Sequence, residues 1–188
     1  MRTLEVRRHT YTKLGGARGR GSHLSQAGVE LARSIGASIG PFAYVAASLA
    51  PRTLETAVAM GFAVDDLLDL SGALWEAAQA ELAHRAARAD PQLHVRYLEL
   101  LNAGGAVAAL GHRQAELWSS IVMRVPDGAQ ALLISHGGLI EPGLVAALPD
   151  WPHVRWGRGF KHCEGARLHH DGTRFVDAEI LVCKDVSD

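Results

Sequence analysis

The sequence predicts an α/β fold, a three-layer α/β/α sandwich with a mostly parallel central sheet. Segments of strand character alternate with segments of helical spacing along the chain. Residues 131–135 form a continuous apolar run, which is typical of a strand buried on both faces. The 188 residues are 48% hydrophobic and contain no linker or internal repeat, so we expect a single domain over residues 1–188.

The first third of the chain predicts two strand–loop–helix units. A strand at 4–8 leads into a glycine-rich, basic loop over 11–21, and Ser25 can cap the helix that follows. A second strand at 44–48 precedes a helix that begins at Pro51, because proline suits the first turn of a helix. This repetition is what a parallel sheet requires.

The middle of the chain predicts one more strand and then mainly helices. A third strand is expected at 66–70, and the alanine-rich run 74–89 predicts a long helix. Shorter helical patterns follow at 94–102 and 111–124, separated by a glycine-containing turn at 102–106.

The last third predicts the central strand and a hairpin. The strand at 131–135 ends at a histidine, and the glycines at 137–138 open a helix that stops at Pro149. Residues 164–181 predict two strands that turn at 170–173.

Charge and composition exclude several classes of partner. The formal net charge is −1 and the isoelectric point is near 6.8, so no overall field would attract nucleic acid or anionic lipid. No segment approaches the roughly 20 apolar residues that span a bilayer, so we expect a cytoplasmic protein without a membrane partner. Cys163 and Cys183 form no CxxC pair, and we expect them to be small buried side chains rather than a disulfide framework.

Two arginines and two histidines follow the predicted strands at the end where parallel strands place their ligands. Arg8 and His9 end the first strand, Arg52 lies just past the second, and His136 follows the central strand. Guanidinium groups match phosphate oxygens, and a helix opened by Gly137 would add its N-terminal amides. The sequence therefore predicts a phosphate pocket.

The residue types in this pocket indicate phosphoryl transfer to an imidazole. A neutral His9 carries a lone pair that can attack phosphorus, provided that its other ring nitrogen donates to a backbone carbonyl. His136, Arg8 and Arg52 would stabilise the charge on the transferred group. We expect activity to fall at low pH as His9 takes up a proton, and the arrangement requires neither a metal nor a cofactor.

Four segments resemble the motifs of the histidine phosphatase superfamily, which includes cofactor-dependent phosphoglycerate mutases and small phosphomonoesterases. Val6-Arg7-Arg8-His9-Thr10 resembles the RHG motif of the family's first strand, and Leu24-Ser25-Gln26-Ala27-Gly28 resembles its LTxxG helix start. Residues 47–57 resemble the SxxxRxxxTA segment, and residues 133–138 resemble the VSHGG segment. The four motifs occur in the family's order over most of the chain.

The resemblance implies a phosphoglycerate mutase-like fold and a phosphatase that forms phosphohistidine on His9. It also implies that Arg8, Arg52 and His136 complete the phosphate pocket and that the substrate is a small phosphorylated molecule. A chain of 188 residues is short for the mutases, which favours hydrolysis. Thr10 departs from the family pattern, because glycine or alanine usually stands there.

The proton donor has two candidates, Asp69 and Glu76. By resemblance the family takes a carboxylic acid from this segment to protonate the leaving oxygen. The spacing to the following glycine and Trp-Glu favours Asp69, whereas the residue type favours Glu76. We expect Glu76 to be the donor, with Asp69 as the alternative.

Other interpretations remain open at this point. His9 and His136 can be two ordinary buried histidines, and the pocket can belong to a mutase or to a noncatalytic module that binds a phosphorylated ligand. Histidine and cysteine side chains are also zinc ligands, but those near the end of the chain fit no closed ligand spacing. These side chains are His153, His162, Cys163, His169 and His170. The sequence predicts no oligomeric state.

Overall fold

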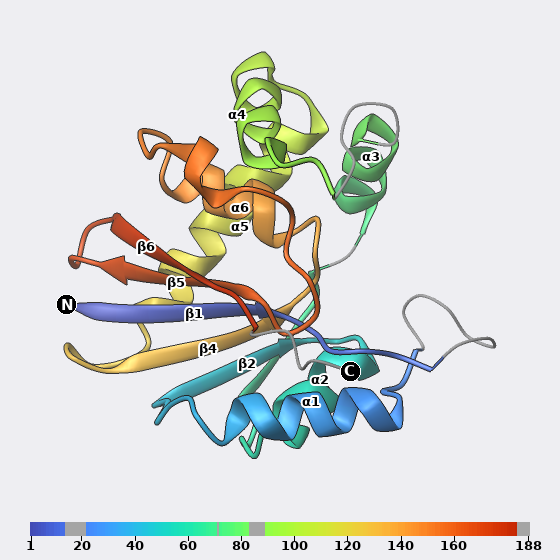
Figure 1. The fold of residues 1–188 in the computed structure, drawn as a ribbon. Helices are drawn as coiled ribbons and strands as arrows, with labels where there is room; N and C mark the ends of the chain where they lie inside the picture. The colour runs from blue at the N-terminus through green and yellow to red at the C-terminus, as the bar shows by residue number, and fades with distance from the viewer. Residues whose placement is uncertain (14–21, 71, 83–88, 184–188) are drawn as a thin grey trace.

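A six-stranded mixed sheet forms the centre of the computed structural model, which describes residues 1–13, 22–70, 72–82 and 89–183 (Figure 1). The strands are β1 (Arg2–Arg8), β2 (Tyr44–Ser48), β3 (Asp66–Leu68), β4 (Gln130–Ser135), β5 (Gly165–His170) and β6 (Phe175–Leu181). Their order across the sheet is β3-β2-β4-β1-β5-β6. The first four in this order are parallel, and β5 and β6 are antiparallel additions. The predicted mostly parallel sheet is confirmed.

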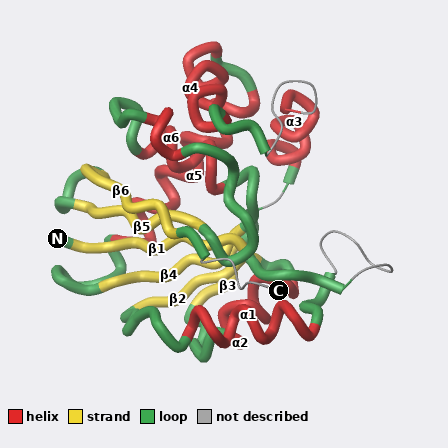
Figure 2. Tube along the Cα trace, viewed as in Figure 1, coloured by secondary structure: helices red, strands yellow, loops and turns green. Residues whose placement is uncertain are grey.

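Helices cover both faces of the sheet, as Figure 2 shows in the same orientation. They are α1 (Gln26–Gly36), α2 (Pro51–Ala59), α3 (Ala73–Leu82), α4 (Leu93–Ala103), α5 (Ala106–Val122), α6 (Ile140–Ala147) and a short 3-10 helix, η1 (His153–Trp156). In Figure 1, α1 and α2 lie on one face, whereas α5 and α6 lie on the other with α4 and α3 beyond them. Within the described ranges, no helix combines the length and apolar character needed to cross a membrane.

The alternation of side chains along β4 explains why this strand lies in the middle of the sheet. Leu133 packs into the core beneath α5 and α6, while Leu132 and Ile134 pack against α1 and α2. All three side chains are completely buried. Successive side chains of a strand point to opposite faces, so an unbroken apolar run needs cover on both sides.

Local signals place the helices of the first half as predicted. The Ser25 hydroxyl accepts a hydrogen bond from the backbone N–H of Gly28 and caps α1. Pro51 stands in the first turn of α2, where a missing N–H costs nothing. The hairpin of β5 and β6 is also confirmed, and it turns at Asp171.

Several boundaries differ from the prediction. β3 ends at Leu68, so Asp69 lies past the carboxyl end of its strand. α6 begins at Ile140 because Gly138, with φ of 87°, belongs to a turn after β4. The alanine-rich helix is described from Ala73 to Leu82; residues 83–88 of that run, and residues 14–21 of the glycine-rich loop, lie outside the described residues.

Candidate active site

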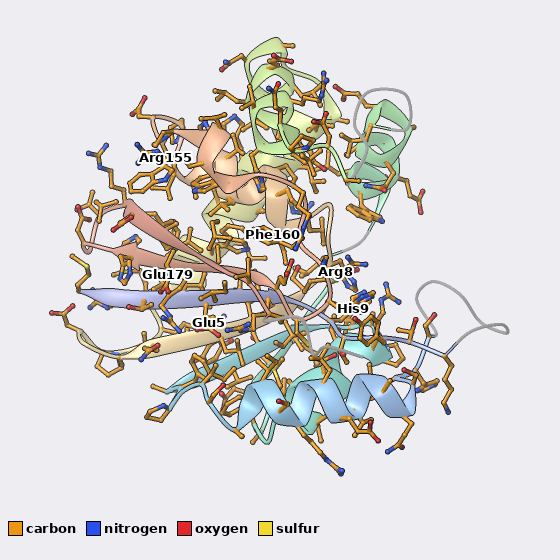
Figure 3. All side chains as sticks on the ribbon, in the orientation of Figure 1. Glu5, Arg8, His9, Arg155, Phe160 and Glu179 are labelled. Carbon is orange, nitrogen blue, oxygen red and sulfur yellow. The ribbon has the colours of Figure 1, made fainter. Side chains whose placement is uncertain are left out.

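The pairing of the parallel strands brings the predicted histidines to one edge of the sheet. Arg8 of β1 pairs with Ser135 of β4, so His9 and His136 each follow the last paired residue of adjacent strands. Ala47 of β2 pairs with Ile134 on the other side of β4. Figure 3 shows Arg8 and His9 at this end of the sheet, with Phe160 close by.

A pocket of about 400 Å³ opens at this edge. Its lining consists of Arg8, His9, Ser48, Leu49, Ala50, Arg52, Asp69, Leu70, Trp75, His136, Gly137 and Leu139. Two arginines and two imidazoles therefore meet in one cavity, as the sequence predicted. This combination suits a phosphoryl group because guanidinium donors match its oxygens.

His9 has a defined orientation in the pocket. Its Nδ1 lies 2.7 Å from the carbonyl oxygen of Thr10. A carbonyl can only accept, so Nδ1 carries the hydrogen and Nε2 keeps its lone pair. The ring centroid lies 5.4 Å from that of His136, and the side chain of His9 is 9% exposed. The expected bond from one ring nitrogen to a backbone carbonyl is present.

Thr10 places its side chain outside the lining of the pocket. The hydroxyl donates to the carbonyl of Gly28 in α1 over 3.1 Å, and the backbone N–H donates to the hydroxyl of Thr56 in α2. A Cβ at Gly28 would lie 2.2 Å from the carbonyl oxygen of Tyr11, so α1 approaches this backbone closely. The methyl and hydroxyl groups of Thr10 therefore fill the packing between the first loop and the two helices.

His136 is bonded to Ser48, the serine of the motif at residues 47–57. Its Nε2 lies 2.7 Å from Oγ of Ser48, the last residue of β2. Ser48 Oγ in turn lies 2.8 Å from the hydroxyl of Thr53 in α2. This chain of hydrogen bonds orients the His136 ring from the neighbouring strand.

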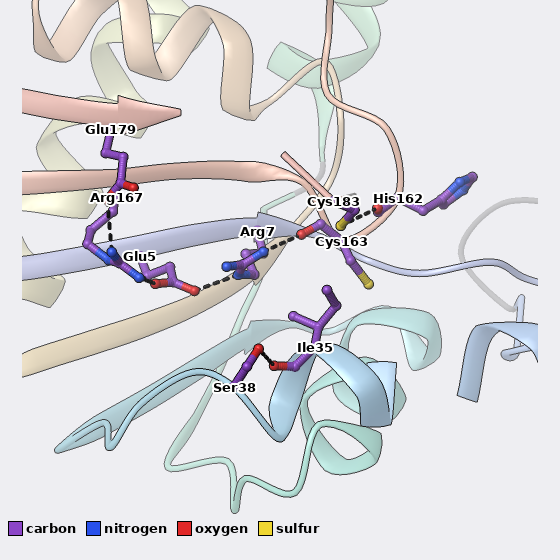
Figure 4. A network of polar contacts seen from close by, with 9 residues as sticks. All are labelled: Glu5, Arg7, Ile35, Ser38, His162, Cys163, Arg167, Glu179 and Cys183. Carbon is purple, nitrogen blue, oxygen red and sulfur yellow. Dashed lines mark hydrogen bonds and ion pairs between the residues drawn. The ribbon is translucent and has the colours of Figure 1, made fainter. Parts of the chain in front are cut away.

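The two consecutive arginines of β1 have different partners, because neighbouring side chains of a strand point to opposite faces. Arg7 bonds Glu5 at 2.5 Å and donates to the carbonyl of Cys163 at 2.7 Å (Figure 4). Arg167 joins the same carboxylate of Glu5 at 2.8 Å. This buried network keeps Arg7 out of the pocket and anchors the segment before β5.

Arg8 is held by that same segment. Its Nη1 donates to the carbonyl of Phe160 over 2.8 Å, and the N–H of Phe160 donates to Glu141 over 3.1 Å. Glu141, which is 1% exposed, also accepts the N–H of Gly138 at 2.5 Å. The sequence predicted that the backbone amides at the start of the helix after β4 bind phosphate. For Gly138 this prediction is wrong, because its N–H already donates to Glu141. Gly137 does line the pocket.

His162, one of the possible metal ligands in the sequence, lies beside Arg8 and His9 at the carboxyl end of β1. Its Nε2 lies 3.4 Å from Nη2 of Arg8, and its ring centroid lies 5.7 Å from that of His9. The ring of Tyr11 lies 4.4 Å from that of His162. Gly165 pairs with Arg7, so the residues just before β5 must lie beside His9. The place of His162 beside His9 could not be predicted from sequence, because it depends on the pairing of β5 with β1.

The two proposed donors are both exposed residues, and they differ in their relation to the pocket. Asp69 lines the pocket, whereas Glu76, in the first turn of α3, is not among the residues that line it. The preceding residue, Trp75, does line the pocket, and its ring lies 3.1 Å from where a Cβ on Gly138 would stand. The placement therefore favours Asp69 over the expected Glu76.

The alternative metal ligands do not converge. Within the described ranges, no group of three or more histidine, cysteine, aspartate or glutamate side chains is placed to hold a metal ion. His153 bonds the carbonyl of Leu148, and His169 and His170 follow one another on β5. Both cysteines are free thiols, and burial raises the pKa of Cys163 to about 11.

Both imidazoles of the pocket are neutral near pH 7. Burial lowers the pKa of His9 to about 2; the proximity of His136 and the charges of Arg52 and Arg8 act in the same direction, although the Thr10 carbonyl opposes the shift. Burial and the same two arginines lower the pKa of His136 to about 3. Protonation of His9 in the free enzyme should therefore reduce activity only far below pH 5.

These shifts predict a loss of stability in mild acid. The unfolded chain protonates each histidine below its ordinary pKa of 6.5, while the folded protein does not, so stability falls as pH drops below 6.5. At pH 5 each histidine should cost about 2 kcal/mol of unfolding free energy relative to pH 7. Between pH 7 and pH 5, His9→Asn should lose about 2 kcal/mol less unfolding free energy than the wild type, as measured by urea unfolding. The exposed His112→Asn should match the wild type; equal losses in all three proteins would contradict the prediction.

Comparisons with known proteins identify the family and the fold. The model of the histidine phosphatase superfamily (branch 1) matches residues 6–178. Phosphoserine phosphatase from Entamoeba histolytica, solved with 3-phosphoglyceric acid, has a TM-score of 0.69 at 17% identity, with 98% of each chain covered. Mycobacterial glucosyl-3-phosphoglycerate phosphatase with VO3 has a TM-score of 0.64 at 20% identity, covering 96% of this chain and 98% of that one.

Phosphoglycerate mutase from Bacillus anthracis str. Sterne has the same fold, with a TM-score of 0.59 at 17% identity over 95% of this chain and 92% of that one. Among curated proteins, none matches the sequence. The family model spans nearly the whole chain and includes all four motifs. The chain therefore belongs to the histidine phosphatase superfamily and is an enzyme of the phosphatase class.

Proposed function

We propose that the protein hydrolyses phosphomonoesters by way of a phosphohistidine on Nε2 of His9. The observation that supports this proposal most directly is the bond from Nδ1 of His9 to the Thr10 carbonyl, which leaves Nε2 unprotonated in a pocket with two arginines. The depressed pKa of His9 keeps the nucleophile neutral at physiological pH. Solved structures of similar fold include two named phosphatases of small phosphorylated molecules, which supports the same substrate class.

The first step transfers the phosphoryl group to the enzyme. Nε2 of His9 forms a bond to phosphorus as the bond to the leaving oxygen breaks, and Asp69 donates a proton to that oxygen. Arg8 and Arg52 bind the phosphoryl oxygens, and His136 adds a hydrogen bond as negative charge moves onto them. The product alcohol leaves, and the phosphoryl group remains on His9.

The second step returns the enzyme to its starting state. The carboxylate of Asp69 accepts a proton from a water molecule, which attacks phosphorus while the bond to Nε2 breaks. Inorganic phosphate leaves, and both His9 and Asp69 regain their initial protonation. A mutase would instead pass the phosphoryl group to an alcohol of its substrate.

Release of inorganic phosphate tests the proposal. The purified protein should hydrolyse para-nitrophenyl phosphate and simple alkyl phosphates with a divalent-metal chelator present, and each ester consumed should yield one phosphate. Addition of glycerol as an acceptor should not divert most of the product. Predominant transfer to glycerol would indicate a mutase, and binding of inorganic phosphate without turnover of any ester would indicate a noncatalytic module.

A further inference from the structure

A second cavity adjoins the phosphate pocket between α3 and α5. It has a volume of about 150 Å³. Its lining consists of Leu68, Asp69, Leu70, Leu74, Trp75, Leu110, Arg113, Gln114 and Leu117. Asp69, Leu70 and Trp75 also line the phosphate pocket, so the two cavities share a wall. We call this second cavity the leucine cavity.

One buried polar atom of a residue that lines the leucine cavity has no hydrogen-bond partner among the described residues. Gln114 is 2% exposed, and its Oε1 is buried without a hydrogen bond to any described residue. A Cβ on Gly143 would lie 2.8 Å from the Cβ of Gln114, so α6 packs closely against Gln114. A buried acceptor without a donor is costly, and a ligand hydroxyl that enters the leucine cavity would supply the missing hydrogen.

The remaining walls indicate what else the ligand contains. Five leucines and Trp75 provide an apolar surface, while Arg113 is exposed and brings a positive charge to the rim. In another protein, an apolar cavity of about 150 Å³ binds benzene. The volume of the leucine cavity therefore suits a six-membered ring. A hydroxyl group on that ring would donate a hydrogen bond to Oε1 of Gln114 and accept one from the guanidinium of Arg113.

The position of Asp69 indicates how such a ring would be connected. As the proposed donor, Asp69 faces the oxygen that joins phosphorus to the leaving group, and it is also part of the wall of the leucine cavity. A leaving group that continues past Asp69 and Trp75 would enter this cavity. The phosphoryl group would remain between the arginines.

We propose that the leucine cavity is the subsite for the leaving group, and that it takes a hydroxylated ring joined to the phosphoester oxygen by a short linker. This inference rests on the proposed phosphomonoesterase activity and names its substrate class. Burial of the ring against the leucine side chains increases the affinity for the substrate, and the hydroxyl of the ring donates a hydrogen bond to Oε1 of Gln114.

A series of synthetic esters tests the subsite. The substrates are ethyl phosphate and ω-phenylalkyl phosphates with linkers of one to four carbons, each with and without a para-hydroxyl. We expect the best phenylalkyl ester to exceed ethyl phosphate in kcat/KM by about tenfold or more, because its ring is buried. The hydroxyl should add about a further fivefold by pairing a buried acceptor. A kcat/KM that does not change with ring or hydroxyl overturns the subsite.

Two variants connect these preferences to the cavity. In Gln114→Leu, the preference for the hydroxylated ester over its unsubstituted partner should disappear. Leu117→Phe should reduce the preference for phenylalkyl esters over ethyl phosphate by filling the cavity, which provides a second test should the first variant fold poorly. Gln26→Leu, an exposed change on α1, is the matched control and should keep both ratios.

The outcomes separate the subsite from the proposed function. Hydrolysis of ethyl phosphate with no preference among the esters refutes the subsite alone. Absence of phosphate release from every ester refutes the phosphomonoesterase itself. Ratios that are unchanged in both cavity variants also refute the subsite, even if the wild type prefers rings.

Discussion

His9→Ala should lower kcat for every phosphomonoester by roughly 10⁴-fold or more, since removal of a catalytic nucleophile has effects of this order. The expected loss of kcat follows from the orientation of the His9 ring. The Thr10 carbonyl takes the Nδ1 hydrogen, so Nε2 can attack phosphorus, and alanine provides no atom for that bond. The measurement is single-turnover hydrolysis of a ³²P-labelled ester, with the protein precipitated and counted at short times.

The label on the wild-type protein should be lost in acid and retained in base, which distinguishes phosphohistidine from a phosphoester. His9→Ala should carry no such label, although Arg8 and Arg52 remain and should still bind inorganic phosphate. The matched control is His112→Ala, which removes an exposed imidazole on α5 and should be labelled like the wild type. Retention of acid-labile label in His9→Ala would place the phosphoryl group on another residue.

Asp69→Asn should slow the hydrolysis of esters with poor leaving groups by about 10²- to 10³-fold, the range expected for loss of a general acid. An alkoxide requires a proton as it departs, whereas para-nitrophenolate is stable without one. The variant should therefore hydrolyse para-nitrophenyl phosphate far better, relative to the wild type, than it hydrolyses ethyl phosphate. The experiment measures kcat/KM for both esters in each protein, because kcat/KM includes only the steps up to departure of the leaving group and excludes the attack of water, in which Asp69 also acts.

Glu76→Gln is the matched control for this test, because it makes the same change of carboxylate to amide seven residues away. Glu76 is not among the residues that line the pocket, so we expect little change in kcat/KM for either ester. A large leaving-group effect in Glu76→Gln with none in Asp69→Asn would restore the assignment that the residue type had favoured. Loss of kcat/KM for both esters to the same degree in Asp69→Asn would indicate a role other than proton donation to the leaving oxygen.

The nucleophile and the donor differed in how far they could be predicted from sequence. His9 follows a strand whose partner, β4, is recognisable from its apolar run, and parallel strands bring their carboxyl ends together. Asp69 and Glu76 lie around the start of α3, beyond a strand of three residues. Which of them reaches the pocket depends on how α3 packs against α5 and on the ring of Trp75, and neither is encoded in local spacing.

The α/β order, the caps of α1 and α2 and the four motifs of the family could be predicted from sequence, because they depend on backbone propensity and on side-chain periodicity along one segment. Three features of the site depend instead on the folded chain: the tautomer of His9, the fact that Asp69 rather than Glu76 lines the pocket, and the place of His162 beside Arg8. The same is true of the hydrogen bond from the N–H of Gly138 to Glu141. These features arise from contacts between segments far apart in the chain, whose geometry follows from strand pairing and burial rather than from spacing.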